Sequence, residues 1–474
     1  MLKKATKIIA TLGPASMDKM EELIEAGVDC FRLNFSHGDG PTFEPHIRAI
    51  REASRIKKRH IPILADIQGP KIRIGKMPAE GVRLIEGNTF ILTEENLEIG
   101  SETKVHTPYP YLTQDAKAGA KILLADGTIE LAVLEIKPPD VICRVIMGGI
   151  LYSNKGINLP GTRLTISTLT DKDRTDLTYI AKADIDMVAL SFVRSAADVE
   201  EARKYLAERK VTIMAKLERP EALHRLDEIL EASDGIMIAR GDLGVEMEFE
   251  TIPILQKKIL KRSALRGKWA VVATQMLGTM VFSNRPSRAE VSDVLNAVLD
   301  GADAVMLSEE SAMGKYPVAA VEAMTKIVRE AEAEVLPPDI PFDPDIMSFA
   351  AGAAGAAVIA ASRINAKAIV ALAGSGLTAL LVSKRKPSIP ILALSAHVPT
   401  LRRLNVLRGV QPVAVRENSD MESQIREADR FLRENDYALP GDPVIIAAAI
   451  PIGEKKETNT IRFHKVRTED TGPL

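Results

Sequence analysis

The chain has 474 residues, of which 46% are hydrophobic and only 4% aromatic, and its formal net charge is −2. At about 150 residues per domain this length predicts about three globular domains, and the balanced charge gives no basic surface of the kind that binds nucleic acid or anionic lipid. The two cysteines, Cys30 and Cys143, fit neither a disulfide framework nor a zinc site. Because the sequence also lacks a signal peptide and a membrane-spanning run of about 18 apolar residues, we expect a cytoplasmic protein without membrane contact.

Short apolar runs alternate with helical patterns from residue 6 onward, which is typical of strand–helix repeats in a parallel sheet. The runs that predict strands lie at 6–13, 30–36, 61–67, 187–193, 211–218, 235–241, 269–274 and 303–308. Helical patterns lie between them at 43–58, 197–209, 220–231, 252–267 and 286–300. Eight such units predict an α/β fold with a (β/α)₈ TIM barrel, formed by residues 1–70 and 168–336.

Two further segments depart from this rhythm. Residues 71–167 carry short alternating runs with frequent Gly, Pro and Asp, which predicts a small β-barrel inserted after the third strand, where it can act as a lid. Four prolines in 337–344 predict a linker. Strands and helices alternate again in 345–474 and predict a C-terminal α/β domain, which we interpret as regulatory.

The predicted barrel strands end in polar residues, at the end where catalytic groups of such barrels lie. Lys216 and Glu218 share one face of a strand, and Asp242 follows the next strand. Two carboxylates on neighbouring strands suit Mg²⁺, which takes one or two carboxylates together with substrate oxygens. The alternative is a structural network of ion pairs.

Two weaker motifs add cationic and amide side chains to the candidate site. Arg32, Asn34 and Ser36 share one face of the second strand, and arginine offers a planar fork for phosphate; the next residue, His37, has no second histidine at metal-ligand spacing and is interpreted as structural. After the Gly69–Pro70 hinge, Lys71 and Arg73 are placed at the cleft below the lid. The alternative for these two is a linker with solvated charges.

Residues 374–379 match the G-x-G-x-x-A dinucleotide pattern, but the required acidic residue about 20 positions further on is missing. We therefore interpret Ser375, Gly376 and Thr378 as a loop at a helix start that holds a phosphorylated-metabolite effector. The basic runs at 57–59 and 384–386 end predicted helices, and we interpret both as solvated caps.

Several long segments resemble the pyruvate kinase family, in the same order and over nearly the whole chain. They include TKIIATLGPAS, FRLNFSHG, ADIQGPKIR, AKLERPEAL, IARGDLGVE, ATQML and the terminal ETNTIRFHKV. The resemblance implies transfer of a phosphoryl group from phosphoenolpyruvate to ADP, which yields pyruvate and ATP. It also implies Mg²⁺ or Mn²⁺ as cofactor and a homotetramer.

The resemblance also implies roles for individual residues. Glu218 and Asp242 would hold the metal ion, and Lys216 would stabilise the transferring phosphoryl group. Arg73 and Lys172 would neutralise nucleotide phosphates, while the backbone at Gly241 would receive the substrate carboxylate. The implied catalytic residues are Lys216, Thr274, Arg32 and Ser308, and the implied substrate- and nucleotide-binding residues are Arg32, Asn34, His37, Arg73, Lys172, Lys216, Gly241, Asp242 and Thr274.

The sequence departs from the family pattern in the region where many members bind K⁺. That region corresponds to Asn34, Ser36, Asp66, Ile67 and Lys71. Many members have a glutamate in place of Lys71, and a fixed ammonium can replace the charge of a bound cation, so we predict activity without K⁺. In the effector loop, Ala373 replaces the family's leading threonine, which argues against fructose bisphosphate as the effector.

Two other functions compete with phosphoryl transfer. A metal-dependent enolate lyase or aldolase needs the metal pair and a base, but it needs neither Arg73 on a lid nor Lys172 near a nucleotide. A catalytically silent scaffold for metabolite sensing would be expected to lose at least one of four residues, and all four are present: Lys216, Glu218, Asp242 and Thr274. The sequence therefore favours the kinase.

Overall fold

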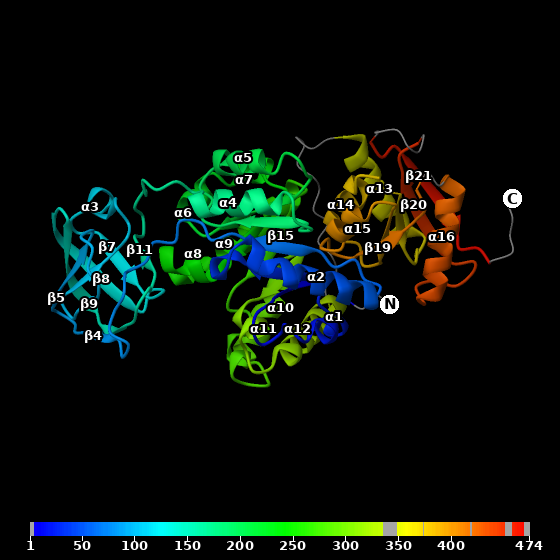
Figure 1. The fold of residues 1–474 in the computed structure, drawn as a ribbon. Coiled ribbons are helices and arrows are strands. Elements are labelled where there is room, and N and C mark those ends of the chain that lie inside the picture. The colour runs from blue at the N-terminus through cyan, green and yellow to red at the C-terminus, as the bar shows by residue number, and fades with distance from the viewer. Residues whose placement is uncertain (1–3, 335–347, 373, 418–419, 451–456, 469–474) are drawn as a thin grey trace.

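The computed structural model describes residues 4–334, 348–372, 374–417, 420–450 and 457–468. Figure 1 shows three bodies in a row, with the inserted β-rich segment at one end, the strand–helix repeats in the middle and the C-terminal segment at the other end. Within the described ranges, no helix is long and apolar enough to cross a membrane.

The middle body is a closed barrel of eight parallel strands, as predicted. In order around the barrel they are β1 (Lys7–Thr11), β16 (Ala304–Leu307), β15 (Trp269–Ala273), β14 (Gly235–Ala239), β13 (Thr212–Leu217), β12 (Met187–Leu190), β3 (Ile63–Asp66) and β2 (Cys30–Asn34). Each is an apolar run almost without exposed residues, as expected of parallel strands that are covered on both sides. Because β3 pairs directly with β12, the long insertion between them leaves the barrel closed.

Helices surround the barrel, and several of them begin at a residue whose side chain caps them. They are α1 (Met20–Ala26), α2 (Gly40–Ile56), α4 (Asp171–Ile180), α5 (Ala196–Tyr205), α6 (Pro220–His224), α7 (Leu226–Ala232), α8 (Arg240–Glu246), α9 (Ile252–Leu265), α10 (Arg288–Leu299), α11 (Glu309–Ala312) and α12 (Pro317–Glu334), with short 3₁₀ turns at Phe35–His37, Phe249–Thr251 and Gly278–Val281. Thr170 and Ser287 form capping boxes that start α4 and α10. The predicted helix over 220–231 is divided at Arg225 into α6 and α7.

The inserted segment folds around its own apolar core. Its elements are β4 (Val82–Leu84), β5 (Thr89–Thr93), β6 (Lys104–His106), α3 (Leu112–Asp115), β7 (Lys121–Leu124), β8 (Ile129–Lys137), β9 (Asp140–Met147), β10 (Gly149–Leu151) and β11 (Ile157–Asn158). The strands form a six-stranded sheet, β11-β7-β8-β9-β5-β6, and a two-stranded sheet, β10-β4. Phe90, Leu131 and Val141 belong to the buried apolar cluster of this segment. The segments that leave and re-enter the barrel are joined by hydrogen bonds, including one of 2.9 Å from Ile157 N to Ile72 O.

The C-terminal body is an α/β layer, again as predicted. It contains α13 (Phe349–Arg363), β17 (Ile369–Leu372), α14 (Leu377–Lys384), β18 (Ile391–Ser395), α15 (Val398–Leu404), β19 (Val410–Ala414), α16 (Met421–Glu434), β20 (Pro443–Ala448) and β21 (Thr460–Lys465). The sheet order is β19-β18-β17-β20-β21, and only β21 is antiparallel to its neighbour within this sheet. The proline segment 337–344 lies outside the described residues.

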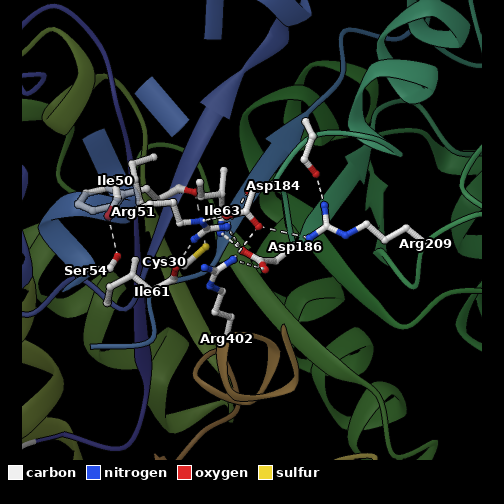
Figure 2. A network of polar contacts seen from close by, with 12 residues as sticks. Cys30, Ile50, Arg51, Ser54, Ile61, Ile63, Asp184, Asp186, Arg209 and Arg402 are labelled. Atoms are coloured by element: carbon white, nitrogen blue, oxygen red, sulfur yellow. Dashed lines mark hydrogen bonds and ion pairs between the residues drawn. The ribbon is translucent and has the colours of Figure 1, made fainter. Parts of the chain in front are cut away.

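The C-terminal body covers the amino-terminal end of the barrel, and one apolar cluster spans both. Ile9 and Met214 of the barrel and Ile369 of the C-terminal sheet belong to this cluster. Polar contacts surround it: in Figure 2, Arg402 of α15 lies against Asp184, with its Nη1 2.7 Å from Asp184 Oδ1. Arg51 of α2 donates to Asp184 and also to Asp186, which leads into β12.

The interpretation of residues 384–386 as a solvated cap is wrong. Lys384 and Lys386 are both buried between the barrel and the C-terminal body. Lys384 forms an ion pair with Asp303, which precedes β16, and Lys386 Nζ donates to Gly301 O at 2.8 Å. At the other run, Lys57 is partly exposed and forms ion pairs with two glutamates of α1, as a cation after a helix end can.

Candidate active site

Lys216 lies at the centre of a polar cluster at the carboxyl ends of the barrel strands. Its Nζ is 2.8 Å from Ser191 Oγ, 2.9 Å from Glu218 Oε1 and 3.2 Å from Asp66 Oδ1. Burial opposes its charge, but the carboxylates of Asp66 and Glu218 raise the pKa of Lys216 above its ordinary value. The side chain is therefore a buried cation held between Asp66, at the end of β3, and Glu218, which directly follows its own strand β13.

Glu218 and Asp242 are the carboxylates expected to hold a metal ion. Glu218 is buried, and its Oε2 accepts a hydrogen bond from Phe192 N at 2.7 Å. Burial raises the pKa of Glu218, Lys216 opposes this shift, and the charge of Asp242 adds to it. Asp242 lies in the first turn of α8 with 29% of its side chain exposed. The two acids are thus close enough to interact, and one of them is open to solvent.

This donor set fits Mg²⁺ or Mn²⁺. Within the described ranges, no group of three or more His, Cys, Asp or Glu side chains is arranged to hold a metal ion. A cation bound by Glu218 and Asp242 would therefore take its other ligands from substrate and water. That ligand set is the one Mg²⁺ favours, since it keeps several waters and binds to one or two carboxylates and to substrate phosphates.

Arg32 completes the cluster on the side of β2. Its Nε donates to Asp66 Oδ2 at 2.7 Å, and its Nη1 donates to Thr11 Oγ1 at 3.0 Å. Asp66 thus contacts the cations of both Arg32 and Lys216. Although burial opposes its charge, these two cations lower the pKa of Asp66.

The other residues of the predicted K⁺ region lie around the end of β2 and β3. Asn34 Oδ1 accepts a hydrogen bond from Ser36 N at 3.2 Å, which turns the chain into the 3₁₀ turn that contains the exposed His37. Ile67 is buried after β3. The Lys71 ammonium lies 3.8 Å from Asp242 Oδ1 and 3.7 Å from Asp126 Oδ1 of the inserted segment. The structure thus places Lys71 beside one expected metal ligand.

Thr274 and Gly241 are in direct contact at the ends of β15 and β14. Gly241 N donates to Thr274 Oγ1 at 2.7 Å, and Thr274 has a φ of 69°, which is rare for a β-branched residue. Such strain is kept where the surrounding structure requires it, often at functional sites. Ser308, at the end of β16, donates its backbone N–H to Glu310 Oε2 at 2.7 Å.

Arg73 and Lys172 contact backbone carbonyls near the cleft. Arg73 Nη1 donates to Asn154 O at 2.9 Å and so joins the two connections of the inserted segment. Lys172 Nζ donates to Phe35 O at 2.8 Å and to Gly38 O at 2.9 Å, and it forms an ion pair with Asp176. Lys172 thereby fixes the loop after β2, and a role toward nucleotide phosphates stays a prediction.

The predicted effector loop is only partly exposed. Gly376 precedes α14 with a φ of 91°, a left-handed conformation that favours glycine, and Ser375 is exposed. Thr378 is buried, and its Oγ1 lies 2.5 Å from Thr458 Oγ1. Ala373 lies outside the described residues.

Sequence reasoning missed Ser191 and Thr11, whose hydroxyls contact Lys216 and Arg32. Both hydroxyls belong to the polar ends of barrel strands, Ser191 directly after β12 and Thr11 as the last residue of β1. That position was the available signal, but a single hydroxyl at a strand end is too common to be singled out.

Comparisons with known proteins agree with this architecture. Residues 3–321 match the family model for the barrel domain of pyruvate kinase, and residues 352–464 match the model for its alpha/beta domain. Among curated relatives, pyruvate kinase 2 of Synechocystis is 42% identical, covering 98% of this chain and 80% of the relative, and pyruvate kinase of Mycobacterium tuberculosis is 41% identical, covering 98% and 99%.

A solved structure gives the same result. The crystal structure of a pyruvate kinase from Cryptosporidium parvum superimposes with a TM-score of 0.92 at 34% identity, and the match covers 98% of this chain and 96% of that one. Both family models, relatives matched over 80% and 99% of their length and a near-complete structural match thus agree. The chain belongs to the pyruvate kinase family of phosphotransferases.

Proposed function

We propose that this chain transfers the phosphoryl group of phosphoenolpyruvate to ADP at the carboxyl end of the barrel. The observation that carries the proposal is the position of Lys216, a buried cation between Asp66 and Glu218 with Arg32 on the far side of Asp66. Phosphoryl transfer needs positive charge fixed around the moving group more than it needs covalent chemistry. A lyase or aldolase would gain little from two cations held in this way.

The residues divide the work by charge and position. Arg32 binds the phosphate of phosphoenolpyruvate, and Lys216 stabilises the charge on the phosphoryl group as it moves. Glu218 and Asp242 would hold Mg²⁺, which neutralises substrate oxygens when bound. The backbone N–H of Gly241 receives the substrate carboxylate, which would displace the Thr274 hydroxyl that it contacts at 2.7 Å.

Thr274 has a second part in this proposal. Once the phosphoryl group has left, the enolate must gain a proton at carbon. The Thr274 hydroxyl, released from Gly241, is then available to deliver a proton through water, with Ser308 beside it at the end of the next barrel strand. The strained backbone of Thr274 holds the hydroxyl at the mouth of the barrel for this purpose.

Further proposals concern the residues that bind the nucleotide, the monovalent cation and the effector. We propose that Arg73 and Lys172 face the phosphates of ADP once the inserted segment closes, and that Lys71 replaces K⁺. In the effector loop, we propose that the exposed Ser375 and the glycine at 376 hold a phosphorylated effector. The homotetramer, the cytoplasmic location and the domain boundaries at 70, 168 and 345 stay predictions.

The decisive experiment measures pyruvate formation from phosphoenolpyruvate and ADP with Mg²⁺, first in buffer freed of K⁺ and then with K⁺ restored. Activity in both buffers supports the transfer and the role of Lys71. Activity only with K⁺ keeps the transfer and contradicts the role of Lys71. If neither buffer gives pyruvate while the folded protein binds Mn²⁺, a lyase or a silent scaffold becomes the better interpretation.

A further inference from the structure

A buried polar cluster lies where the inserted segment rejoins the barrel. Glu246, the last residue of α8, accepts hydrogen bonds at Oε1 from Asn158 Nδ2 at 2.8 Å and from Arg219 Nη1 at 3.1 Å. Asn158 belongs to β11 of the inserted segment, while Arg219 and Glu246 belong to the barrel body. Figure 1 shows α6 and α8 on the side of the barrel that faces the inserted segment. We call Arg219, Glu246 and Asn158 the hinge cluster.

The segment that returns from the insertion is held by two arginines next to the barrel strands. Arg219 Nη2 donates to Thr162 O at 2.9 Å. Arg194, shortly after β12, donates to Leu164 O at 2.9 Å and to Ile166 O at 3.0 Å. The position of the inserted segment is therefore fixed by side chains that start from the ends of β12 and β13.

The hinge cluster is also attached to both proposed metal ligands. Arg219 directly follows Glu218 in the chain, and Glu246 comes four residues after Asp242, about one turn further along α8. A displacement of Asn158 or Thr162 would thus be transmitted to the end of β13 and to α8, which together set the separation of Glu218 and Asp242.

The state of Glu246 is unusual for a group that serves stability alone. Arg219 and Glu246 are only 4% and 5% exposed, and Glu246 Oε2 is a buried oxygen without a hydrogen-bond partner in the described part of the chain. A buried polar atom without a partner costs stability, and its presence calls for an explanation in function or strain. An apolar contact at this hinge would hold the two bodies together at lower cost.

We propose that Arg219 and Glu246 are positioning residues for the metal site. Through the Asn158–Glu246 hydrogen bond, they make the affinity of Glu218 and Asp242 for a divalent cation depend on the position of the inserted segment. In this role Arg219 holds Glu246 Oε1 where it accepts from Asn158. The inference rests on the proposed function, because that function identifies Glu218 and Asp242 as the metal ligands.

The test uses Asn158→Ala in the full chain. This change removes the donor from the inserted segment and leaves the Arg219–Glu246 ion pair intact. Titration calorimetry with Mn²⁺ in the absence of substrate then measures the metal site without turnover. We expect the dissociation constant for Mn²⁺ to rise about tenfold, the size expected for loss of a hydrogen bond to a charged acceptor. Asn88→Ala, at an exposed asparagine of the inserted segment, is the matched control and should leave the constant unchanged.

A second variant tests whether the two residues act as one unit. Glu246→Gln keeps the oxygen that accepts from Asn158 but removes the negative charge, and it should also weaken Mn²⁺ binding. Because both changes loosen the same hinge cluster, the double variant should bind Mn²⁺ more tightly than the sum of the two single effects predicts. Asn158→Leu, which keeps the approximate volume of the side chain, replaces Asn158→Ala if the latter does not fold.

The outcomes separate this inference from the proposed function. If Asn158→Ala and Asn158→Leu fold and bind Mn²⁺ as tightly as the unchanged protein, the hinge cluster is only a structural clamp and the inference is overturned. If the variants weaken Mn²⁺ binding but the unchanged protein forms no pyruvate, the proposed function fails and the positioning role stands. If the unchanged protein forms pyruvate but binds no Mn²⁺ in the absence of substrate, the inference is overturned and the proposed function stands.

Discussion

The Lys216 ammonium and the Asp66 carboxylate lie 3.2 Å apart, although 150 residues separate them in the chain. The same carboxylate binds Arg32 through its other oxygen at 2.7 Å. One buried acid thus holds two cations on the same side of the barrel mouth, with the Lys216 ammonium also against Glu218. This arrangement prepares positive charge for a phosphate before the substrate arrives, so that little reorganisation is left for the reaction itself.

Lys216→Met should reduce kcat by about two to three orders of magnitude or more, because it removes the cation expected to stabilise the moving phosphoryl group. The substitution also leaves Asp66 and Glu218 with one cation fewer, so some loss of stability is expected as well. Steady-state kinetics together with circular dichroism separates the two effects. A folded Lys216→Met variant with near-normal turnover would show that another group stabilises the transfer.

Glu218→Ala should weaken Mn²⁺ binding by at least tenfold, because the remaining carboxylate, Asp242, would have to hold the cation alone. The measurement is a Mn²⁺ titration followed by calorimetry, with Glu231→Ala as the control. Glu231 is an exposed acid of α7 that belongs neither to the proposed metal site nor to the hinge cluster. Equal weakening by both substitutions would mean that the effect is general electrostatics and that Glu218 is not a ligand.

The barrel could be predicted from the sequence because its signals are local. Each strand is a short apolar run followed by a polar residue, and the eight runs occur in the order in which the barrel uses them, apart from the insertion. The same polarity correctly predicted that Lys216, Glu218 and Arg32 would meet, since the carboxyl ends of parallel strands lie at one end of a barrel. No contact between distant elements had to be known.

The contacts between bodies could not be predicted in this way. Lys384 and Lys386 look like solvated cations at a helix end, but docking of the C-terminal sheet on the barrel buries both. Similarly, Arg219 and Glu246 are 27 residues apart on different elements, and neither is unusual where it stands in the sequence. The role of these residues depends on which part of the fold packs against them, and hydrophobic periodicity does not predict such contacts.

Lys71→Glu should make activity depend on K⁺, because it replaces the fixed ammonium next to Asp242 with the glutamate that many family members have. The unchanged protein should keep its full rate when K⁺ is removed, whereas the variant should lose most of its rate and recover it when K⁺ is restored. Lys76→Glu, an exposed residue in the same connection, controls for the change in charge. If the unchanged protein and the Lys71→Glu variant respond equally to K⁺, Lys71 does not replace the cation.

The buried Lys386, between the barrel and the C-terminal body, should make stability depend on pH in the alkaline range. Burial lowers the pKa of Lys386 from 10.5 to about 8, with the nearby charge of Asp303 opposing the shift. Between these two values the unfolded chain binds more protons than the folded one, so the free energy of unfolding should rise with pH across that window. Below about pH 8 the folded protein bears the full cost of the buried charge, of order 3 kcal/mol at most.

Lys386→Met should therefore remove this part of the pH dependence. Its melting temperature relative to that of the unchanged protein should be highest near neutral pH and should fall as the pH rises from about 8 toward 10.5, because only the unchanged protein releases the Lys386 proton in that range. Lys367→Met, at an exposed lysine of the same body, should show a constant difference, which corrects for other groups that titrate at alkaline pH. Thermal unfolding followed at a series of pH values measures all three proteins. Parallel curves for Lys386→Met and the unchanged protein would mean that Lys386 keeps an ordinary pKa despite its burial, and that the contact with Gly301 O is enough to hold the charged ammonium there.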